Sequence, residues 1–395
     1  MRSKMKKIVI WISILLLLAL TTYFGCSGGG GDSGSSSTPS SSSATLASIT
    51  VTPANLNIPA GTTYQFTTSG TYTDGTAHDL TSQVSWSSSD PSVATVKSSG
   101  MGTCVSAGTT TITATLGSIS GNTTLTVTSA TLVAGIINTS TTWSVANSPY
   151  ILTNDVQIAY EATLTIEPGV RIFGENYAIK TWGTLSAVGT NGSKIIFNKV
   201  GLSPGANTSA EPFAINIQYS EINGGSVYPP TGNAIYGSLS LRDSVVRDTS
   251  SYFYLWYPVA DCYIERNIFV REGGITTATM NATKVYVRNN VFYQQAATGA
   301  GTFAVLNYAR YATSDTVVEK NSFLSTDRIA LSLPVGYSTA GMTAINNFWN
   351  TTNTSVIDMM IFDKNDDLGC ASYIVYNPIL TAPDPNTPDP SPYIP

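Results

Sequence analysis

The sequence predicts an all-β protein in which a β-sandwich precedes a right-handed parallel β-helix solenoid. Six segments of the C-terminal half align so that their apolar positions fall in columns, at steps of 23 to 31 residues. Short alternating stretches with Gly, Pro and Asp turns fill the region before them. Helix signals are scarce, β-branched and small polar residues dominate, and charged residues make up only 11% of the 395 residues.

Residues 1–25 have the features of a secretory signal peptide. A basic start precedes an apolar run over residues 8–20, which is too short to cross a membrane as a helix. The following Cys26 resembles the cleavage-site cysteine of bacterial lipoproteins, which implies its lipidation, and Ser27 is compatible with sorting to an outer membrane. Residues 26–45 are rich in Ser and Gly and predict a flexible tether. We therefore expect a lipid-anchored envelope protein of the outer membrane, on its cell-surface or periplasmic face.

Charge and cysteine content narrow the classes of partner. Removal of the signal segment takes away four basic residues and no acidic one, which leaves a net charge of −9. We therefore expect no binding to nucleic acid or to an anionic membrane surface. Three cysteines remain beside Cys26. Cys262 occupies an apolar column, so packing explains it, whereas a bridge from Cys104 to Cys370 would have to link two domains and is not expected.

Residues 46–131 differ in character from the rest of the chain. They include Ile49–Pro53, Val84–Ser88 and Gly108–Ala114. Their alternation predicts a β-sandwich with Trp86 as its buried aromatic residue. In this order the motifs resemble the bacterial immunoglobulin-like domain of group 2, which implies a spacer or adhesive module without catalytic residues. His78, the only histidine of the chain, is expected in a turn and has no second histidine with which to share a metal.

The solenoid prediction depends on six aligned segments. They are Ile215–Ile222, Leu239–Val246, Cys262–Phe269, Val285–Phe292, Thr316–Phe323 and Met342–Trp349. Their first, third and eighth places are apolar except for Thr316. The first and third places share one face of a strand, but the eighth is five residues after the third and would point to the other face of a continuous strand. For all three to point inward, the chain must bend just before the sixth place. A repeat near 23 residues suits three short strands per coil.

Stacking of coils about 4.8 Å apart turns every column into a ladder. The sixth place is always a small polar residue: Ser220, Ser244, Asn267, Asn290, Asn321 and Asn347. We expect these side chains to hydrogen-bond from coil to coil. The fourth place points outward and nearly alternates in charge: Gln218, Arg242, Glu265, Arg288 and Glu319. We interpret this column as a surface ladder of charge pairs, not as catalysts.

The stretches that enter and leave the repeats support the same architecture. Ala162–Val170, Trp182–Thr190 and Asn346–Trp349 resemble parts of secreted right-handed parallel β-helix proteins of the pectate-lyase-like type. Together with the six segments, the resemblance covers most of residues 136–382 of the predicted solenoid domain, residues 132–382. It implies the fold but no activity, since many functions occur on this scaffold. The Pro-rich tail, residues 383–395, is expected to be irregular.

Two enzyme classes of this fold make different demands on the sequence. Polygalacturonase-type enzymes need clustered aspartates and a histidine, and the only histidine lies outside the solenoid. A lyase needs carboxylates that bind Ca²⁺ and a Lys or Arg base, whose basicity must be lowered by desolvation. The candidates on consecutive coils are Asp243, Arg247, Asp248, Arg266, Arg271 and Glu272. Among them Arg247, Asp248, Arg271 and Glu272 are the catalytic candidates of the alternative hypothesis.

A run of aromatic residues provides candidates for binding. Its rings include Tyr252, Tyr254, Trp256 and Tyr257. Alternation along a strand would expose two or three of them, and exposed rings stack on sugars; the other interpretation is that they fill the core. The seventh and ninth places would add Ile268, Val270, Val291 and Tyr293 to a neighbouring face.

One acidic turn near the end of the solenoid offers oxygen ligands. Asp363, Asn365, Asp366 and Asp367 suit Ca²⁺ by ligand type. The turn lacks the spacing and the terminal Glu of an EF-hand, so a polar turn is the expected structure and Ca²⁺ the alternative.

These observations predict an envelope lipoprotein that binds polysaccharide or another surface polymer, or mediates adhesion, without catalysis. A Ca²⁺-dependent polysaccharide lyase, or another carbohydrate-active enzyme, and a structural envelope component are the alternatives. An acid or base beside a groove would favour the enzyme, whereas a flat aromatic face without one would favour binding. A uniformly polar surface would favour the structural role.

Overall fold

The computed structural model describes residues 44–394 except 176, 206–211, 227–236, 251–252, 280–282, 296–302 and 309–314. The predicted signal peptide, Cys26 and residues 27–43 of the tether lie outside these residues. Within them, no helix is both long and apolar enough to cross a membrane. The described chain is almost entirely strand, with one short helix, α1 (Thr354–Met359), and a 3-10 turn at Val145–Asn147, so the all-β prediction is confirmed.

The N-terminal domain contains ten strands in three small sheets. They are β1 (Leu46–Thr52), β2 (Leu56–Pro59), β3 (Thr63–Gln65), β4 (Thr67–Tyr72), β5 (Ala77–Asp79), β6 (Ser85–Ser88), β7 (Ala94–Val96), β8 (Met101–Cys104), β9 (Gly108–Leu116) and β10 (Ile119–Thr128). The sheet orders are β1-β4-β5, β2-β10-β9-β6 and β3-β8-β7. Alternating buried and exposed residues along β9 and β10 place one side of each strand in the core.

The prediction that Trp86 is the buried aromatic residue of this domain is wrong. Phe66 is fully buried, whereas Trp86 is only partly buried and packs against the edge of the same cluster. The two ring centroids lie 6.3 Å apart. The indole N–H of Trp86 donates to the carbonyl of Thr81 at 3.0 Å, which keeps one end of the ring near the surface. His78 lies on the exposed strand β5, not in a turn.

The described residues of the second domain form 24 strands. The first twelve are β11 (Thr131–Ile137), β12 (Thr141–Trp143), β13 (Tyr150–Ile158), β14 (Thr163–Ile166), β15 (Arg171–Phe173), β16 (Ala178–Thr181), β17 (Thr184–Val188), β18 (Ile195–Asn198), β19 (Gly201–Pro204), β20 (Phe213–Gln218), β21 (Ser220–Asn223) and β22 (Gly237–Arg242). The others are β23 (Val245–Arg247), β24 (Phe253–Trp256), β25 (Cys262–Glu265), β26 (Ile268–Val270), β27 (Ile275–Ala278), β28 (Val285–Arg288), β29 (Val291–Tyr293), β30 (Phe303–Asn307), β31 (Thr316–Glu319), β32 (Ser322–Phe323), β33 (Ile329–Ser332) and β34 (Ile361–Phe362).

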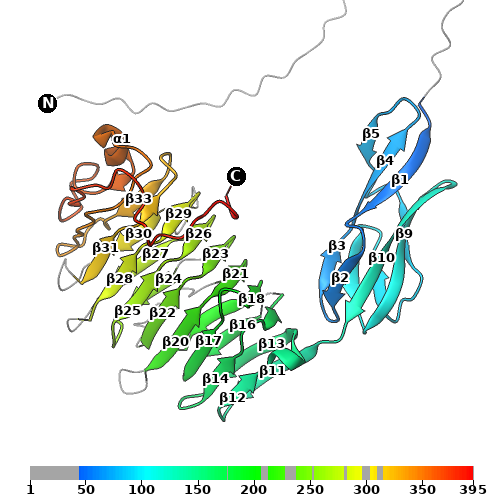
Figure 1. The fold of residues 1–395 in the computed structure, drawn as a ribbon, viewed down its shortest axis with the longest axis horizontal. Coiled ribbons are helices and arrows are strands. Elements are labelled where there is room, and N and C mark those ends of the chain that lie inside the picture. Colours follow the sequence, from blue (N-terminus) through cyan, green and yellow to red (C-terminus); the bar gives the residue numbers. More distant parts are fainter. Residues whose placement is uncertain are drawn as a thin grey trace, which may run out of the picture. The chain divides into compact units, whose positions relative to one another are not determined.

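These strands form a parallel β-solenoid with three faces (Figure 1). Face 1 is the eight-stranded sheet β12-β14-β17-β20-β22-β25-β28-β31. Face 2 is the eleven-stranded sheet that contains β18, β21, β23, β26, β29 and β32, and face 3 is the five-stranded sheet β24-β27-β30-β33-β34. One coil, for example β25-β26-β27, contributes one strand to each face, as the repeat length predicts.

The corner between faces 1 and 2 contains the predicted bend. The residue before each anchor has a positive φ, between 47° and 59°: Tyr219, Asp243, Arg266, Asn289, Lys320 and Asn346. The anchors hydrogen-bond as a ladder: the side-chain amides of Asn267 and Asn290 donate to the Oδ1 atoms of Asn290 and Asn321, each at 3.0 Å. The backbone N–H groups of Asn267 and Asn290 donate to the same oxygens, also at 3.0 Å. This ladder replaces the strand hydrogen bonds that the bend removes.

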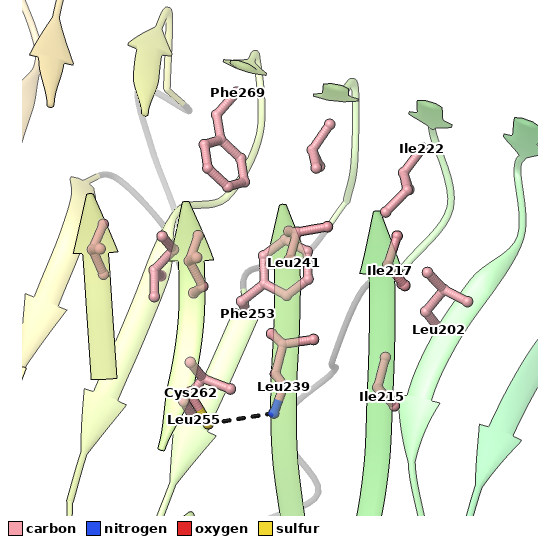
Figure 2. Close-up of a cluster of buried hydrophobic side chains, with 14 of the residues drawn as sticks. Leu202, Ile215, Ile217, Ile222, Leu239, Leu241, Phe253, Leu255, Cys262 and Phe269 are labelled. Carbon is pink, nitrogen blue, oxygen red and sulfur yellow. Dashed lines mark hydrogen bonds between the residues drawn. The ribbon is translucent and has the colours of Figure 1, made fainter. Parts of the chain in front are cut away.

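The interior follows the predicted columns. Apolar side chains from faces 1 and 2 meet in one continuous core, in which the backbone N–H of Leu239 donates to the Cys262 sulfur at 3.4 Å (Figure 2). In the eighth column Phe269 stacks on Phe292, with ring centroids 4.9 Å apart and planes 6° apart. The one polar residue of the inward columns, Thr316, is hydrogen-bonded to Thr277 at 3.0 Å, so its hydroxyl does not lack a partner in the core.

Candidate ligand-binding face of the solenoid

Face 1 has a central outward column that runs the length of the sheet. Strand pairing places its members opposite one another, one per coil. In chain order they are Thr142, Thr165, Ser186, Asn216, Ser240, Tyr263, Tyr286 and Val317. Seven of these eight side chains carry a hydroxyl or amide group, and neighbouring members repeat at the strand spacing of about 4.8 Å. The column is therefore a straight row of groups that both donate and accept hydrogen bonds.

Two tyrosines form the aromatic part of this column. The rings of Tyr263 and Tyr286 stack with centroids 5.2 Å apart and planes 11° apart. The guanidinium carbon of Arg242 lies 4.5 Å from the centre of the Tyr263 ring, and that of Arg288 lies 4.2 Å from the centre of the Tyr286 ring. Cation–π contacts and stacking fix these rings in place. No hydrogen bond from either tyrosine hydroxyl to a described residue is present.

The predicted charge ladder runs beside the central column. Arg242 and Glu265 are 3.0 Å apart, and Arg288 and Glu319 are 2.9 Å apart. All four side chains are partly exposed, so each pair contributes little to stability. The charges cancel within each pair, and the face therefore presents hydrogen-bonding groups without a net charge of either sign. This geometry suits a neutral or weakly charged, hydroxylated ligand.

The arginines of the lyase hypothesis are engaged by neighbours. Arg271 forms a two-point ion pair with Asp248, at 2.6 and 3.0 Å, and this pairing raises the pKa of Arg271 above its usual value. A catalytic base would need the opposite shift. Arg247 lies opposite Val270, as the register predicts, and donates to the side chain of Asn223. Arg247 and Arg271 therefore each have a polar partner on a neighbouring coil, Asn223 and Asp248.

Glu272 is unsuited to contact a substrate. Its side chain is fully buried, with an exposed fraction of 1%. Burial raises the pKa of its carboxyl group to about 8, although the backbone N–H of Gly274 donates to it and lowers the pKa. The carboxyl group of this catalytic candidate therefore lies inside the coil, away from solvent.

The other lyase candidates form part of the corner between faces 1 and 2. Arg266 donates to both oxygens of Asp243, at 2.6 and 2.9 Å. The hydrogen bond to Asp243 raises the pKa of Arg266. Asp243 also accepts from the side chain of Gln218 at 2.9 Å.

The aromatic run gives only part of the predicted binding surface. Tyr252 and the side chain of Trp256 lie outside the described residues. Tyr254 is partly buried against the core, and Tyr257 is half-buried with a φ of 58°. The described rings of this run, Tyr254 and Tyr257, are therefore partly buried and do not form a fully exposed aromatic surface.

The expectation that the seventh and ninth places extend an exposed face is wrong. Ile268, Val270 and Val291 are at most 4% exposed and form a separate apolar cluster with Val245. Tyr293 packs against this cluster. Tyr393 and Ile394, from the C-terminal segment, pack against the same cluster, which explains its burial.

The acidic turn does not gather into a metal site. Asp363 is buried, and its carboxylate accepts the backbone N–H groups of Asn365 at 2.8 Å and Ile374 at 2.7 Å. Asp367 accepts the N–H of Gly369, and Asp366 accepts that of Asp363. Across the described part of the chain, no cluster of three or more His, Cys, Asp or Glu residues is arranged for a metal ion. The carboxylates shape a polar turn.

The sequence analysis did not single out Tyr263 and Tyr286. They occupy the second place of two aligned segments, one residue after the inward first place. Aligning the second places would have shown an outward column, because residues one apart on a strand point to opposite sides.

Comparisons with known proteins match up to about a quarter of the chain. Residues 45–129 match the family model of the bacterial Ig-like domain (group 2). Ice-binding protein 1 of Shewanella frigidimarina is 44% identical over 94 residues, which make up 24% of this chain and 10% of that protein. A solved structure of the surface layer protein SbsC, domains 1–6, matches 24% of this chain and 14% of its own, at 22% identity and a TM-score of 0.20.

These matches confirm the N-terminal domain. Residues 45–129 form a bacterial Ig-like domain of group 2, as the motifs predict. The chain spans about a tenth of the curated relative that it matches. The TM-score of the solved structure is too low to support an argument.

Proposed function

We propose that this chain is a surface-associated, non-catalytic binding protein of the cell envelope, and that face 1 binds an extended hydroxylated polymer, a polysaccharide. The Ig-like domain would act as a spacer. Lipidation of Cys26, with anchoring at the outer membrane, completes the proposal and rests on the sequence of residues 1–26.

The row of hydrogen-bonding side chains on face 1 carries the proposal. A polymer laid along the solenoid axis meets such a group on six of the seven consecutive coils from Thr142 to Tyr286, because the Ser240 hydroxyl is buried. Each contact is weak, but contacts along one chain add without a new loss of translational freedom. Sugar hydroxyl groups match these side chains because both partners donate and accept.

The state of the ionisable groups supports a role without catalysis. Arg271 is ion-paired with Asp248, and the pKa of Arg271 is raised. Glu272 is buried away from solvent. Neither group is poised to transfer a proton to or from a bound substrate.

The proposal is tested by binding of the full chain to a panel of insoluble and soluble neutral and acidic polysaccharides. Replacement of both Tyr263 and Tyr286 by Ala, or Thr165→Arg in the hydroxyl part of the column, should weaken retention at least fivefold. Tyr160→Ala removes a tyrosine that is 44% exposed and lies outside the central column of face 1, and it serves as the control. Retention that survives both changes, or release of unsaturated sugar products, would contradict the proposal.

A second ligand deserves the same test. The matched relative is named an ice-binding protein, and the first coils of face 1 carry a second row of small polar side chains, Thr163, Thr184 and Ser238, interrupted by Ala214. Regularly spaced hydroxyl groups on a flat sheet are suited to ordered water. Inhibition of ice recrystallisation by the full chain, lost in Thr165→Arg and kept in Tyr160→Ala, would favour ice over polysaccharide.

A further inference from the structure

The C-terminal segment, residues 383–394, has no strand yet lies along the solenoid (Figure 1). Near its start, Asp384 accepts a hydrogen bond from the side chain of Asn289 at 2.8 Å. The hydroxyl of Thr387 donates to the carbonyl of Lys320 at 3.1 Å. Near its end, the Tyr393 hydroxyl accepts from Lys194 at 2.7 Å. The segment therefore crosses several coils, from the C-terminal end of the solenoid back toward its first third.

A cavity of about 530 Å³ lies between this segment and the solenoid corner. Its volume falls within the range of roughly 300–1,000 Å³ that is usual for small-molecule sites. The solenoid contributes Tyr219, Asp243 and Arg266, and the segment contributes Asn386 and Tyr393. Polar groups and aromatic rings thus converge on one space from two parts of the chain.

Two ion pairs lie at this cavity, and a further carboxylate, Asp389 of the segment, is exposed and accepts hydrogen bonds from Ser391. The Arg266–Asp243 pair is held by two hydrogen bonds, and the side chains are 38% and 15% exposed. Lys194 lies 3.2 Å from Glu221. Burial lowers the pKa of Lys194, but its hydrogen bonds to Tyr393 and Glu221 more than offset this and raise the pKa above its usual value. A charged ligand would have to compete with these pairs.

A hydroxylated neutral ligand would not break the pairs. A guanidinium has five N–H groups, and the pair with Asp243 uses two of them. A sugar hydroxyl can accept from a remaining N–H and donate to a carboxylate oxygen at the same time. Tyr219 of the solenoid and Tyr393 of the C-terminal segment both line the cavity. Their rings offer apolar surface to the C–H groups of a sugar ring.

We propose that the pocket beneath the C-terminal segment binds a neutral sugar residue, at a site separate from face 1. The segment forms one wall of this site, and the Arg266–Asp243 pair hydrogen-bonds to the hydroxyl groups of the sugar. The site requires no metal and no catalytic group.

The test is titration of the full chain with glucose, galactose, mannose, xylose and N-acetylglucosamine, and with their trisaccharides, by calorimetry and NMR. Glucuronate and glucosamine serve as charged probes. At least one neutral sugar should bind saturably, and more tightly than both charged probes. Asp243→Asn should weaken this binding at least fivefold, and Asn191→Trp, on an exposed loop that lines the pocket, should block it without change to the core.

The controls separate this site from face 1. Tyr160→Ala and the double replacement of Tyr263 and Tyr286 should leave sugar affinity within twofold of the unmodified chain, even if polymer binding by face 1 is lost or never observed. Thermal unfolding verifies that each variant is folded. The proposal is overturned if no neutral sugar binds saturably, if a charged probe binds more tightly, or if folded Asn191→Trp keeps full affinity.

Discussion

The asparagine ladder shows how one side-chain type replaces backbone pairing at a corner. The amide oxygens of Asn290, Asn321 and Asn347 each accept both from the side chain and from the backbone N–H of the preceding anchor. Each amide nitrogen also reaches a carbonyl on the preceding coil, as Asn290 does with Ile264 at 2.8 Å. The ladder continues to Ser244 and Ser220: the backbone N–H of Ser244 donates to the Asn267 amide oxygen, and that of Ser220 donates to the Ser244 hydroxyl, so the acceptor does not need to be an amide.

Replacement of Asn290 by Ala should destabilise the protein by about 3 kcal/mol, because buried donors and acceptors on two coils lose their partners at about 1–3 kcal/mol each. Chemical unfolding measures the loss. Asn350→Ala is the matched control, since that amide makes one hydrogen bond, to the Leu324 carbonyl, from an exposed position. Equal losses in the two variants would show that the ladder is energetically unimportant.

Glu272 should make stability depend on pH. Burial raises the pKa of Glu272 to about 8 in the folded state, against the ordinary value of 4.5. Between these values the folded chain holds a proton that the unfolded chain releases, so this group's stabilising contribution is complete below pH 4.5 and is lost as pH rises to about 8. The limiting slope is about 1.4 kcal/mol per pH unit.

The variant Glu272→Gln removes this titration while its amide oxygen still accepts from Gly274. Its stability relative to the unmodified chain should rise between pH 5 and pH 8, as measured by urea unfolding across that range. A difference that stays constant with pH would mean that Glu272 ionises normally in the folded protein.

At the scale of the element, the C-terminal segment behaves as a structural part of the solenoid. Outward apolar side chains on β23, β26 and β29 would face water without it, and Tyr393 and Ile394 pack against them. Three short strands with apolar outer faces would otherwise form an exposed patch. As its prolines predict, the tail has no regular secondary structure. Its contacts with Asn289, Lys320 and Lys194 nevertheless hold it against the solenoid.

Deletion of residues 383–395 should therefore lower the free energy of unfolding by about 2 kcal/mol, from the loss of burial by two large side chains. It should also increase binding of a hydrophobic dye, because Val245, Ile268 and Val291 become exposed. Tyr393→Phe keeps the ring and loses only the contacts to Lys194 and Glu221, so dye binding should stay low in that control. An unchanged dye signal after the deletion would mean that the cluster remains covered.

At the scale of the molecule, the described cysteines are distributed between the two domains without a bridge. Cys104, Cys262 and Cys370 are buried and free. Burial raises the pKa of Cys104 to about 11 and that of Cys262 to about 12, which disfavours the reactive thiolate. Stability comes from packing and ladders, in agreement with the expectation that Cys104 and Cys370 are not joined.

Cys104, Cys262 and Cys370 should thus resist alkylation in the folded chain, and a reducing agent should not change its melting temperature. After unfolding, protein recovered from a bacterial envelope should take up three labels if Cys26 is lipidated and four if it is not. Mass spectrometry counts the labels, locates them and detects the lipid directly. Rapid labelling of Cys104, Cys262 or Cys370 in the folded chain would contradict the burial of these thiols.

The periodic part of this protein was readable from its sequence. Coils stack with the same residues in register, so the inward columns, the bend before Asn267 and the charge pair of Arg242 with Glu265 appear as repeated letters. The Ig-like domain was readable for a similar reason, since its strand motifs recur in order across that family. The outward tyrosines of face 1 belong to the second column of the same alignment, which mixes polar, aromatic and apolar residues and therefore marks no face by composition.

Features that do not repeat were decided only by the tertiary structure. The contact of Lys194 with Tyr393 joins residues 199 positions apart, and no period in the sequence marks it. The burial of Glu272 and the pairing of Arg271 with Asp248 likewise depend on which neighbours the coil provides. The sequence by itself determined the stacked coils and their ladders, because one rule acts at every coil. Only the folded chain determined the covered face, the pocket and the states of the ionisable groups, because each depends on a single contact between distant segments.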